Sequence, residues 1–384
     1  MFTNFTATPG DNNSRNGSMK AQMDFMEGDD EFLGSKIGVE YMDYIHPHWR
    51  QYRAPSAYQH FVLGIIYGII LFMGILGNLL VLIPFFSIKA LRSPSNLFVA
   101  NLAIFDTLMM SKLPMFVVNS VYEGQYFGKV GCDLYGLVGS YSGMGAAITN
   151  SAIAFDRYRT IAKPLDGRLS MKTALGLVVG TWIWATPFSI LPFFEIWSRY
   201  APEGYLTTCS FDYMTEGQST QIFTIVIFCW AYVIPLLMIA LFYSNILSHV
   251  REHEKMLKEQ AKRMNVKSLS QNEEKSAEIR IAKVAISIVF LFICGWTPYA
   301  LVAIIGCFGD RRLMTPTFSM FPAIACKTVA CIDPWIYAIN HPRFRTEIQK
   351  KMPCLRILQK KKNSKASENK SAVSEVTVIK SETA

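Results

Sequence analysis

Seven long apolar stretches constrain the fold of this chain more than any other feature of its sequence. Each is long enough to cross a bilayer, which takes about 20 mostly apolar residues in a helix. Hydrophobic residues make up 51% of the chain and charged residues only 17%, which excludes an average soluble enzyme and a disordered protein. The sequence therefore predicts an all-α bundle of seven transmembrane helices, over residues 58–85, 96–119, 132–161, 174–194, 222–247, 279–307 and 316–339.

The charges that flank these stretches predict the side of the membrane on which each end lies. Segment 249–280 holds eight Lys and Arg residues, and residues 340–384 hold eleven against four Glu. Because Lys and Arg are enriched in cytoplasmic loops, we expect both segments in the cytoplasm. An odd number of spans then places the N-terminus outside the cell, in agreement with glycosylation sequons at Asn4, Asn12 and Asn16. Since the basic loops account for the net charge of +9, we expect no nucleic-acid partner.

These signals divide the chain into four regions. Residues 1–57 are expected to form an extracellular, glycosylated N-terminus, and residues 58–340 the seven-helix domain. Residues 341–356 carry apolar side chains among bases, which predicts a short amphipathic helix on the membrane lipid. Cys354 in this stretch is either palmitoylated or a free thiol. The polar composition of residues 357–384 predicts a disordered cytoplasmic tail.

Two of the eight cysteines differ from the others in their position. Cys132 opens the third span, and Cys209 lies in the outer loop between the fourth and fifth spans. Both are expected on the oxidising side of the membrane, where a disulfide persists. A bridge between them would pin the outer loop across the mouth of the bundle.

Lys327 is the most informative ionisable residue inside a span. Eleven residues of the seventh span precede it, so its amine cannot easily reach the membrane surface. An ionisable group inside a membrane is costly and usually marks function. The amine is either paired with an acid from another span or is a desolvated nucleophile that forms a Schiff base with an aldehyde. The residues alone leave both alternatives open.

A charged triplet, Asp156-Arg157-Tyr158, ends the third span at its cytoplasmic face. Arg157 can pair with its neighbour Asp156 or with Glu278, which lies at the start of the sixth span. A pair that breaks on activation would make this contact a switch. The alternative is an interfacial salt bridge with no switching role.

Four further motifs lie in the first, second, sixth and seventh spans, and the prolines of the last two place helix kinks there. The motifs are Gly77-Asn78, Leu102-Ala-Ile-Phe-Asp106, Trp296-Thr-Pro298 and Asp333-Pro334-Trp-Ile-Tyr337. Together with the charged triplet, they resemble the rhodopsin-like G-protein-coupled receptors over about residues 55–355. Asp333 departs from the Asn that this family usually has there, and Gly295 from its usual Cys. The resemblance implies a receptor rather than an enzyme, so we assign no catalytic residue and no metal ligand.

The position of Lys327 narrows the resemblance to the opsins. It stands six residues before Asp333, as the retinal-binding lysine does in that family. The resemblance therefore implies 11-cis retinal, or its 3-hydroxy form, bound to Lys327 as a Schiff base.

Details of the loops are similar to the arthropod rhabdomeric visual opsins. The stretch His253-Glu-Lys255 is the part of that group associated with coupling to a Gq-type G protein and phospholipase C. The resemblance further implies a receptor kinase and arrestin as partners, and a location in the rhabdomeric microvilli of photoreceptor cells. Ser and Thr residues of the tail would be the phosphorylation sites.

A protonated Schiff base is a buried cation and needs an anion to compensate it. Vertebrate visual opsins carry a Glu where this chain has Tyr135, which is no anion near neutral pH. The resemblance points instead to Glu203 in the outer loop, six residues before Cys209. The alternative for Glu203 is a solvent-exposed loop acid.

Lys112 is a second amine inside a span. It either extends to the membrane surface or lies close to the retinal. Near the retinal, its charge would favour the unprotonated Schiff base, which absorbs at shorter wavelength. Its segment resembles arthropod ultraviolet opsins, whereas other stretches resemble the blue branch. The expectation is ultraviolet absorption, with blue as the alternative.

Aromatic residues complete the expected pocket. We predict that Trp296, Tyr299, Phe211 and Tyr135 line it, although aromatic residues at helical spacing are more often simply core. Two rival functions stay open at this point. One is a retinal photoisomerase of the same fold, and the other is a receptor for a diffusible ligand in which Lys327 is structural.

Overall fold

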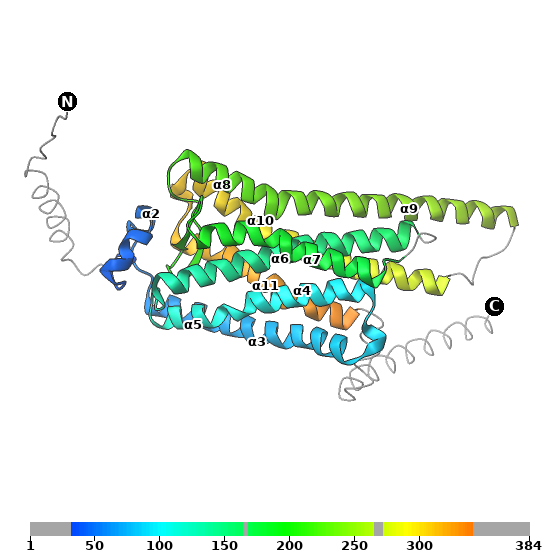
Figure 1. The fold of residues 1–384 in the computed structure, drawn as a ribbon, viewed down its shortest axis with the longest axis horizontal. Helices are drawn as coiled ribbons and strands as arrows, with labels where there is room; N and C mark the ends of the chain where they lie inside the picture. The colour runs from blue at the N-terminus through cyan, green and yellow to red at the C-terminus, as the bar shows by residue number, and fades with distance from the viewer. Residues whose placement is uncertain (1–31, 164–167, 265–271, 341–384) are drawn as a thin grey trace, which may run out of the picture.

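The computed structural model describes residues 32–163, 168–264 and 272–340, and these form a bundle of long helices that run along one direction (Figure 1). A two-stranded hairpin and several short helices lie at one end. The long helices are α3 (Ala57–Ser87), α4 (Pro94–Ser111), α5 (Leu113–Val121), α6 (Gly128–Ala162), α7 (Met171–Phe193), α8 (Gln218–Phe228), α9 (Ile234–Met264), α10 (Asn272–Phe308) and α11 (Pro316–Asn340). The short elements are η1 (Val39–Tyr44), α2 (Pro47–Arg50), η2 (Lys89–Leu91), β1 (Tyr200–Glu203), β2 (Thr208–Phe211), the π-helical turn η3 (Cys229–Val233) and η4 (Arg311–Leu313).

Each of the seven predicted spans lies, to within one residue, in a helix or a run of helices. The second span is α4 with α5, and the fifth is α8, η3 and α9. Within the described residues, five spans are long and apolar enough to cross a membrane by length and composition. The other two, α6 and α11, are less apolar because they occupy the interior: α6 packs against α4, α7 and α9, and α11 against α3, α4 and α10. Their polar side chains therefore face protein rather than lipid.

Local sequence signals set several helix starts. The Ser56 side chain accepts a hydrogen bond from the backbone N–H of Gln59, whose own side chain accepts one from the N–H of Ser56. This reciprocal capping box satisfies two backbone donors that a helix N-terminus otherwise leaves free. The Ser93 side chain caps α4 by accepting from the backbone N–H of Asn96, and Pro94 follows at the first helical position, where its missing N–H costs nothing.

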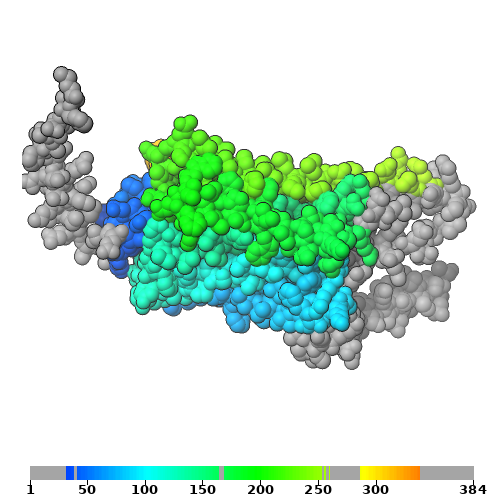
Figure 2. Space-filling view, viewed as in Figure 1, coloured from blue at the N-terminus to red at the C-terminus, as the bar shows by residue number. Residues whose placement is uncertain are grey.

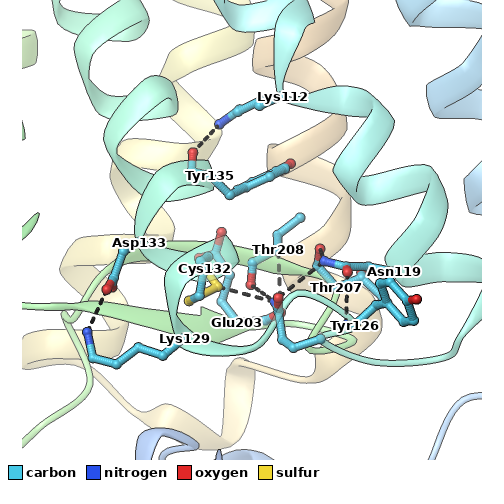
Figure 3. Close-up of a disulfide and its surroundings, with 12 residues drawn as sticks. Lys112, Asn119, Tyr126, Lys129, Cys132, Asp133, Tyr135, Glu203, Thr207 and Thr208 are labelled. Atoms are coloured by element: carbon cyan, nitrogen blue, oxygen red, sulfur yellow. Dashed lines mark hydrogen bonds and ion pairs between the residues drawn. A yellow bond between two sulfur atoms is a disulfide. The ribbon is translucent and has the colours of Figure 1, made fainter.

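The second span is broken at Lys112, which lies between α4 and α5. Pro114 stands at the beginning of α5 and has no N–H to continue the hydrogen bonding of α4. The break therefore follows from the Leu113-Pro114 sequence. It turns the Lys112 side chain toward α6, where it lies against the Tyr135 ring (Figure 3).

The β1–β2 hairpin closes one end of the bundle. Its antiparallel register runs from Tyr200 opposite Phe211 to Glu203 opposite Thr208. The predicted disulfide between Cys132 and Cys209 is present and ties β2 to α6. The hairpin thus lies across the bundle end, as expected, whereas the far end of α9 lies at the opposite end of the molecule (Figure 1).

Residues 32–53 cover the same end of the bundle, shown in blue in Figure 2. Ile45 and Trp49 are fully buried, and the His48 imidazole lies 2.7 Å from the Met314 carbonyl oxygen, before α11. Part of the predicted N-terminal region is therefore folded onto the helices. The sites predicted at Asn4, Asn12, Asn16 and Cys354, the amphipathic stretch and the tail lie outside the described residues.

Candidate functional site

A cavity lies inside the bundle, beneath the hairpin, with about 920 Å³ of space between protein atoms when the part open to solvent is included. Its walls come from α6, the fifth span, α10, α11 and the hairpin. The structure brings all seven residues predicted for the pocket to this one cavity. They are Lys112, Tyr135, Glu203, Phe211, Trp296, Tyr299 and Lys327.

Lys327 presents a buried amine to the cavity from α11, with only 4% of the residue exposed. Its Nζ donates to the Ala323 carbonyl oxygen at 2.9 Å and lies 4.0 Å from the Cys326 Sγ. Among the described residues, no carboxylate oxygen lies within 4.0 Å of this amine. The structure therefore shows no direct ion pair for Lys327 and leaves its amine at the cavity wall.

Glu203 is a buried carboxylate on the hairpin, 5% exposed, so the alternative of a solvent-exposed loop acid is wrong. Its two oxygens each accept a phenol hydrogen bond, from Tyr213 at 2.9 Å and from Tyr299 at 3.0 Å. Burial raises the pKa of Glu203, while the charge of Lys327 and the two phenols oppose that rise. The carboxylate is thus fixed in orientation and sensitive to positive charge in the cavity.

Lys112 is also buried, with 6% of the residue exposed, so its side chain does not extend to the membrane surface. Its Nζ lies 4.2 Å from the centroid of the Tyr135 ring and 3.5 Å from the Tyr135 carbonyl oxygen (Figure 3). A cation over an aromatic face is stabilised by the ring quadrupole. Two lysine amines therefore share one cavity with one carboxylate.

Trp296 and Tyr299 line the cavity from α10, their rings edge to face with centroids 6.4 Å apart. Opposite them, α6 has glycine at 143, where an added Cβ would lie 2.4 Å from the Trp296 ring. Sequence reasoning missed this glycine, and it missed Tyr213. The recurrence of glycine at 136, 139 and 143 on one helical face was a signal for close packing at α6.

The residues predicted to switch the receptor lie toward the other end of the bundle. Arg157 forms an ion pair with Asp156, and both are buried. Tyr158 is partly buried, with its ring stacked against Phe242. The side chains of Glu278 and His253 lie outside the described residues, so the proposed Arg157–Glu278 contact stays a prediction.

Lys255 is exposed on α9, toward its free end. Asp333 and Pro334 of α11 line a small cavity with Asn78 and Asp106, so the three polar groups of the family motifs, Asn78, Asp106 and Asp333, lie together. Tyr337, also at this cavity, donates from its hydroxyl to the Asn96 side-chain oxygen at 2.8 Å.

The comparisons with known proteins agree with this architecture. A family described as "7 transmembrane receptor (rhodopsin family)" matches residues 77–337. The blue-sensitive opsin of Apis mellifera is 55% identical over 84% of this chain and 86% of its own length. The chain belongs to the opsins of the rhodopsin family. This opsin is also 47% identical to the ultraviolet-sensitive opsin of Apis mellifera, over 87% of this chain and 91% of that protein. It resembles the crystal structure of squid rhodopsin with a TM-score of 0.76 and 33% identity, over 81% of this chain and 90% of that chain.

Membership of this family confirms the predicted class. The protein is a multi-pass membrane protein with a seven-transmembrane fold, a light-sensing G-protein-coupled receptor and not an enzyme. Neither rival function, the photoisomerase or the receptor for a diffusible ligand, is favoured by these relatives. Opsins imply a retinal chromophore, and the cavity fits one. Its walls are largely apolar and aromatic, and it contains a buried amine.

The two phenols on Glu203 allow a test of how its carboxylate is held. We expect Tyr213→Phe to raise the pKa of Glu203 by roughly one unit, because a hydrogen bond that favours the ionised form is lost. The protonated carboxyl would then persist to higher pH in an infrared titration of its C=O stretch. Glu203→Gln, which lacks the carboxyl, assigns the band. An unchanged or lower midpoint in Tyr213→Phe would show that the bond does not stabilise the carboxylate.

Proposed function

We propose that this opsin is a short-wavelength visual pigment that holds 11-cis retinal, or its 3-hydroxy form, on Lys327 and activates a Gq-type G protein. The observation that carries the proposal is the buried Lys327 amine at the wall of a cavity that also contains the buried Glu203 carboxylate. Retinal would supply the absorption of light and a change of shape on isomerisation to the all-trans form. The protein residues would supply its attachment, its charge environment and the response.

Attachment uses the nucleophilic amine of Lys327. This amine would hold retinal through a C=N bond, with the aldehyde oxygen lost as water, so that no oxidant or reductant would be needed. The amine attacks in its unprotonated form. Ala323, one helical turn earlier, holds the amine through its carbonyl oxygen.

Glu203 would compensate the positive charge of the protonated Schiff base. Its hydrogen bonds to Tyr213 and Tyr299 direct its two oxygens and support the ionised form. Tyr135, which occupies the position of the vertebrate Glu, would border the chromophore and hold Lys112 rather than act as an anion. A compensating charge carried by the hairpin, not by a membrane helix, distinguishes this arrangement.

Ultraviolet absorption is proposed from Lys112. A positive charge in the same cavity as the Schiff base disfavours the protonated form, and the unprotonated form absorbs at shorter wavelength. Similarity to both the blue-sensitive and the ultraviolet-sensitive opsin of Apis mellifera makes blue absorption the alternative.

Signalling is proposed to start at Trp296, which lies at the cavity two residues before the helix-kinking Pro298. Movement of α10 at this kink would disturb the region of the buried Asp156–Arg157 pair and open a surface for Gq near His253 and Lys255. Receptor kinase and arrestin would act on the tail. We place the N-terminus outside the cell and the C-terminus in the cytoplasm of rhabdomeric photoreceptor cells.

The test starts from the purified protein reconstituted with 11-cis retinal in the dark. We expect an ultraviolet native band, and acid denaturation should convert it to the visible band of a trapped protonated Schiff base. Illumination should then accelerate nucleotide exchange on a Gq-type G protein more than on a Gi-type one. A native band in the visible would support the assignment as a retinal pigment and contradict the assignment of ultraviolet absorption. No retinal adduct, or no light-driven exchange, would overturn the proposal.

A further inference from the structure

Three glycines of α6, at 136, 139 and 143, border the cavity on one face of the helix. Each leaves room for a different side chain. A Cβ at 136 would overlap the Tyr200 ring and a Cβ at 143 the Trp296 ring. A Cβ at Gly139 would lie 2.0 Å from the Nζ of Lys112 and 3.2 Å from its Cε. The Lys112 amine therefore occupies space that any larger residue at 139 would fill.

Next to Gly139, α6 provides two contacts for the Lys112 amine. Tyr135, one helical turn before Gly139, contributes its ring at 4.2 Å and its carbonyl oxygen at 3.5 Å. Both partners favour the charged form of an amine, the ring through its quadrupole and the carbonyl as an acceptor. The absent side chain at 139 lets Lys112 approach the helix closely enough to meet both.

We propose that Gly139 is a positioning residue for Lys112 and thereby helps to set the wavelength that the pigment absorbs. This inference rests on the proposed role of Lys112 as a charge near the Schiff base. A methyl group at 139 would displace the amine from the ring and carbonyl of Tyr135. The ammonium form of Lys112 would lose these partners in a buried site, so the neutral amine would become more populated. The positive charge that repels a protonated Schiff base would therefore weaken.

The experiment compares Gly139→Ala with the unchanged protein after reconstitution with 11-cis retinal. Absorption spectra over a range of pH follow the conversion between ultraviolet and visible forms. We expect the visible form of Gly139→Ala to persist to a pH higher by roughly one unit, the size of a lost cation–π contact. An unchanged conversion, or one displaced to lower pH, would overturn the proposal. Alanine is a better helix former than glycine, so α6 itself is not weakened.

The same substitution in a Lys112→Ala background separates this mechanism from a direct effect on retinal. If Gly139 acts through Lys112, adding Gly139→Ala to Lys112→Ala changes the conversion little. An equal displacement in both backgrounds would overturn the inference, because a methyl group acting on retinal itself does not need Lys112.

Three further outcomes are distinguishable. If Gly139→Ala fails to fold but the double variant folds and binds retinal, the overlap is with Lys112, as proposed. If neither folds, Gly139 serves another contact and the inference is wrong. If Lys112→Ala alone leaves the spectrum unchanged, it is the proposed tuning role of Lys112 that fails, whatever the effect of Gly139→Ala.

Discussion

Replacement of Lys327 by alanine is expected to abolish the covalent retinal adduct completely. The C=N bond needs a primary amine at the cavity wall, and alanine offers none at that place. Borohydride reduction in the presence of 11-cis retinal, followed by mass spectrometry of the intact protein, measures the adduct directly. The unchanged protein should gain the mass of one reduced retinal, and Lys327→Ala should gain none.

Lys112 makes this test demanding, because the cavity contains a second buried amine. Lys112→Ala is therefore the matched control, and it should retain the full adduct. Peptide mapping of the reduced protein should place the added mass on Lys327, since the Lys112 amine is engaged by the Tyr135 ring and carbonyl. An adduct that survives Lys327→Ala, or maps to Lys112, would contradict the assignment. Thermal denaturation of the retinal-free variants shows whether each is folded.

Apolar stretches predict all seven spans of this fold, but the spans are not equally apolar, for a physical reason. Five of them include a window of high hydropathy. The other two, α6 and α11, pack against several helices, and α6 carries many Gly, Ser, Thr and Asn side chains that pack or hydrogen-bond against its neighbours. A bilayer-spanning helix that is surrounded by protein has no reason to be uniformly apolar.

The cap at the hairpin end could not be predicted from local pattern. Residues 32–53 form only short helices and turns, with no periodicity, and their order comes from contacts with distant parts of the chain. His48 with the Met314 carbonyl is one example, and the ion pair of Lys36 with Glu123 is another. Such contacts carry no signal in a sequence taken alone.

For the site, residue chemistry and family resemblance identified the charged and aromatic groups but not their supports. Lys327, Lys112 and Glu203 stand out because a membrane protein seldom buries a charge. Tyr213 and Gly139 do not, since a tyrosine in a loop and a glycine in a helix are common. Their importance comes only from proximity, a phenol 2.9 Å from Glu203 and a missing Cβ beside Lys112.

Lys112→Glu should convert an ultraviolet pigment into one that absorbs in the visible at neutral pH. The substitution reverses the sign of a charge in the Schiff-base cavity. At an effective dielectric constant of about 20, two unit charges separated by the width of a small pocket, on the order of 8 Å, interact by about 2 kcal/mol, or roughly 1.5 pH units. Reversal of the charge doubles this, so the visible form should persist to a pH about 3 units higher. Absorption spectra of the dark pigment over a range of pH give the midpoint.

Lys129→Met is the control for charge outside the cavity. Lys129 lies near the start of α6, paired with Asp133 at 2.6 Å and Glu195 at 2.8 Å, and its loss changes net charge by one unit. Because Lys129 and its two partners are more exposed than Lys112 and their charges are screened by solvent, the absorption band of the pigment should not move. If Lys129→Met moves the band as far as Lys112→Glu does, net charge rather than position sets the absorption.

The glutamate variant has one complication, and a neutral variant resolves it. In Lys112→Glu, the Tyr135 carbonyl oxygen that accepts from Lys112 would face a carboxylate. Because two acceptors would then meet in a buried site, the new carboxylate would tend to take up a proton. Lys112→Met removes the positive charge and keeps an unbranched side chain of similar length, so its effect is the loss of repulsion alone. The visible form should therefore persist to a pH about 1.5 units higher in Lys112→Met, half the change from full reversal. A Met variant that stays in the ultraviolet at every pH would show that the electrostatic account of Lys112 is wrong, because no protonation of an introduced acid can hide the effect there.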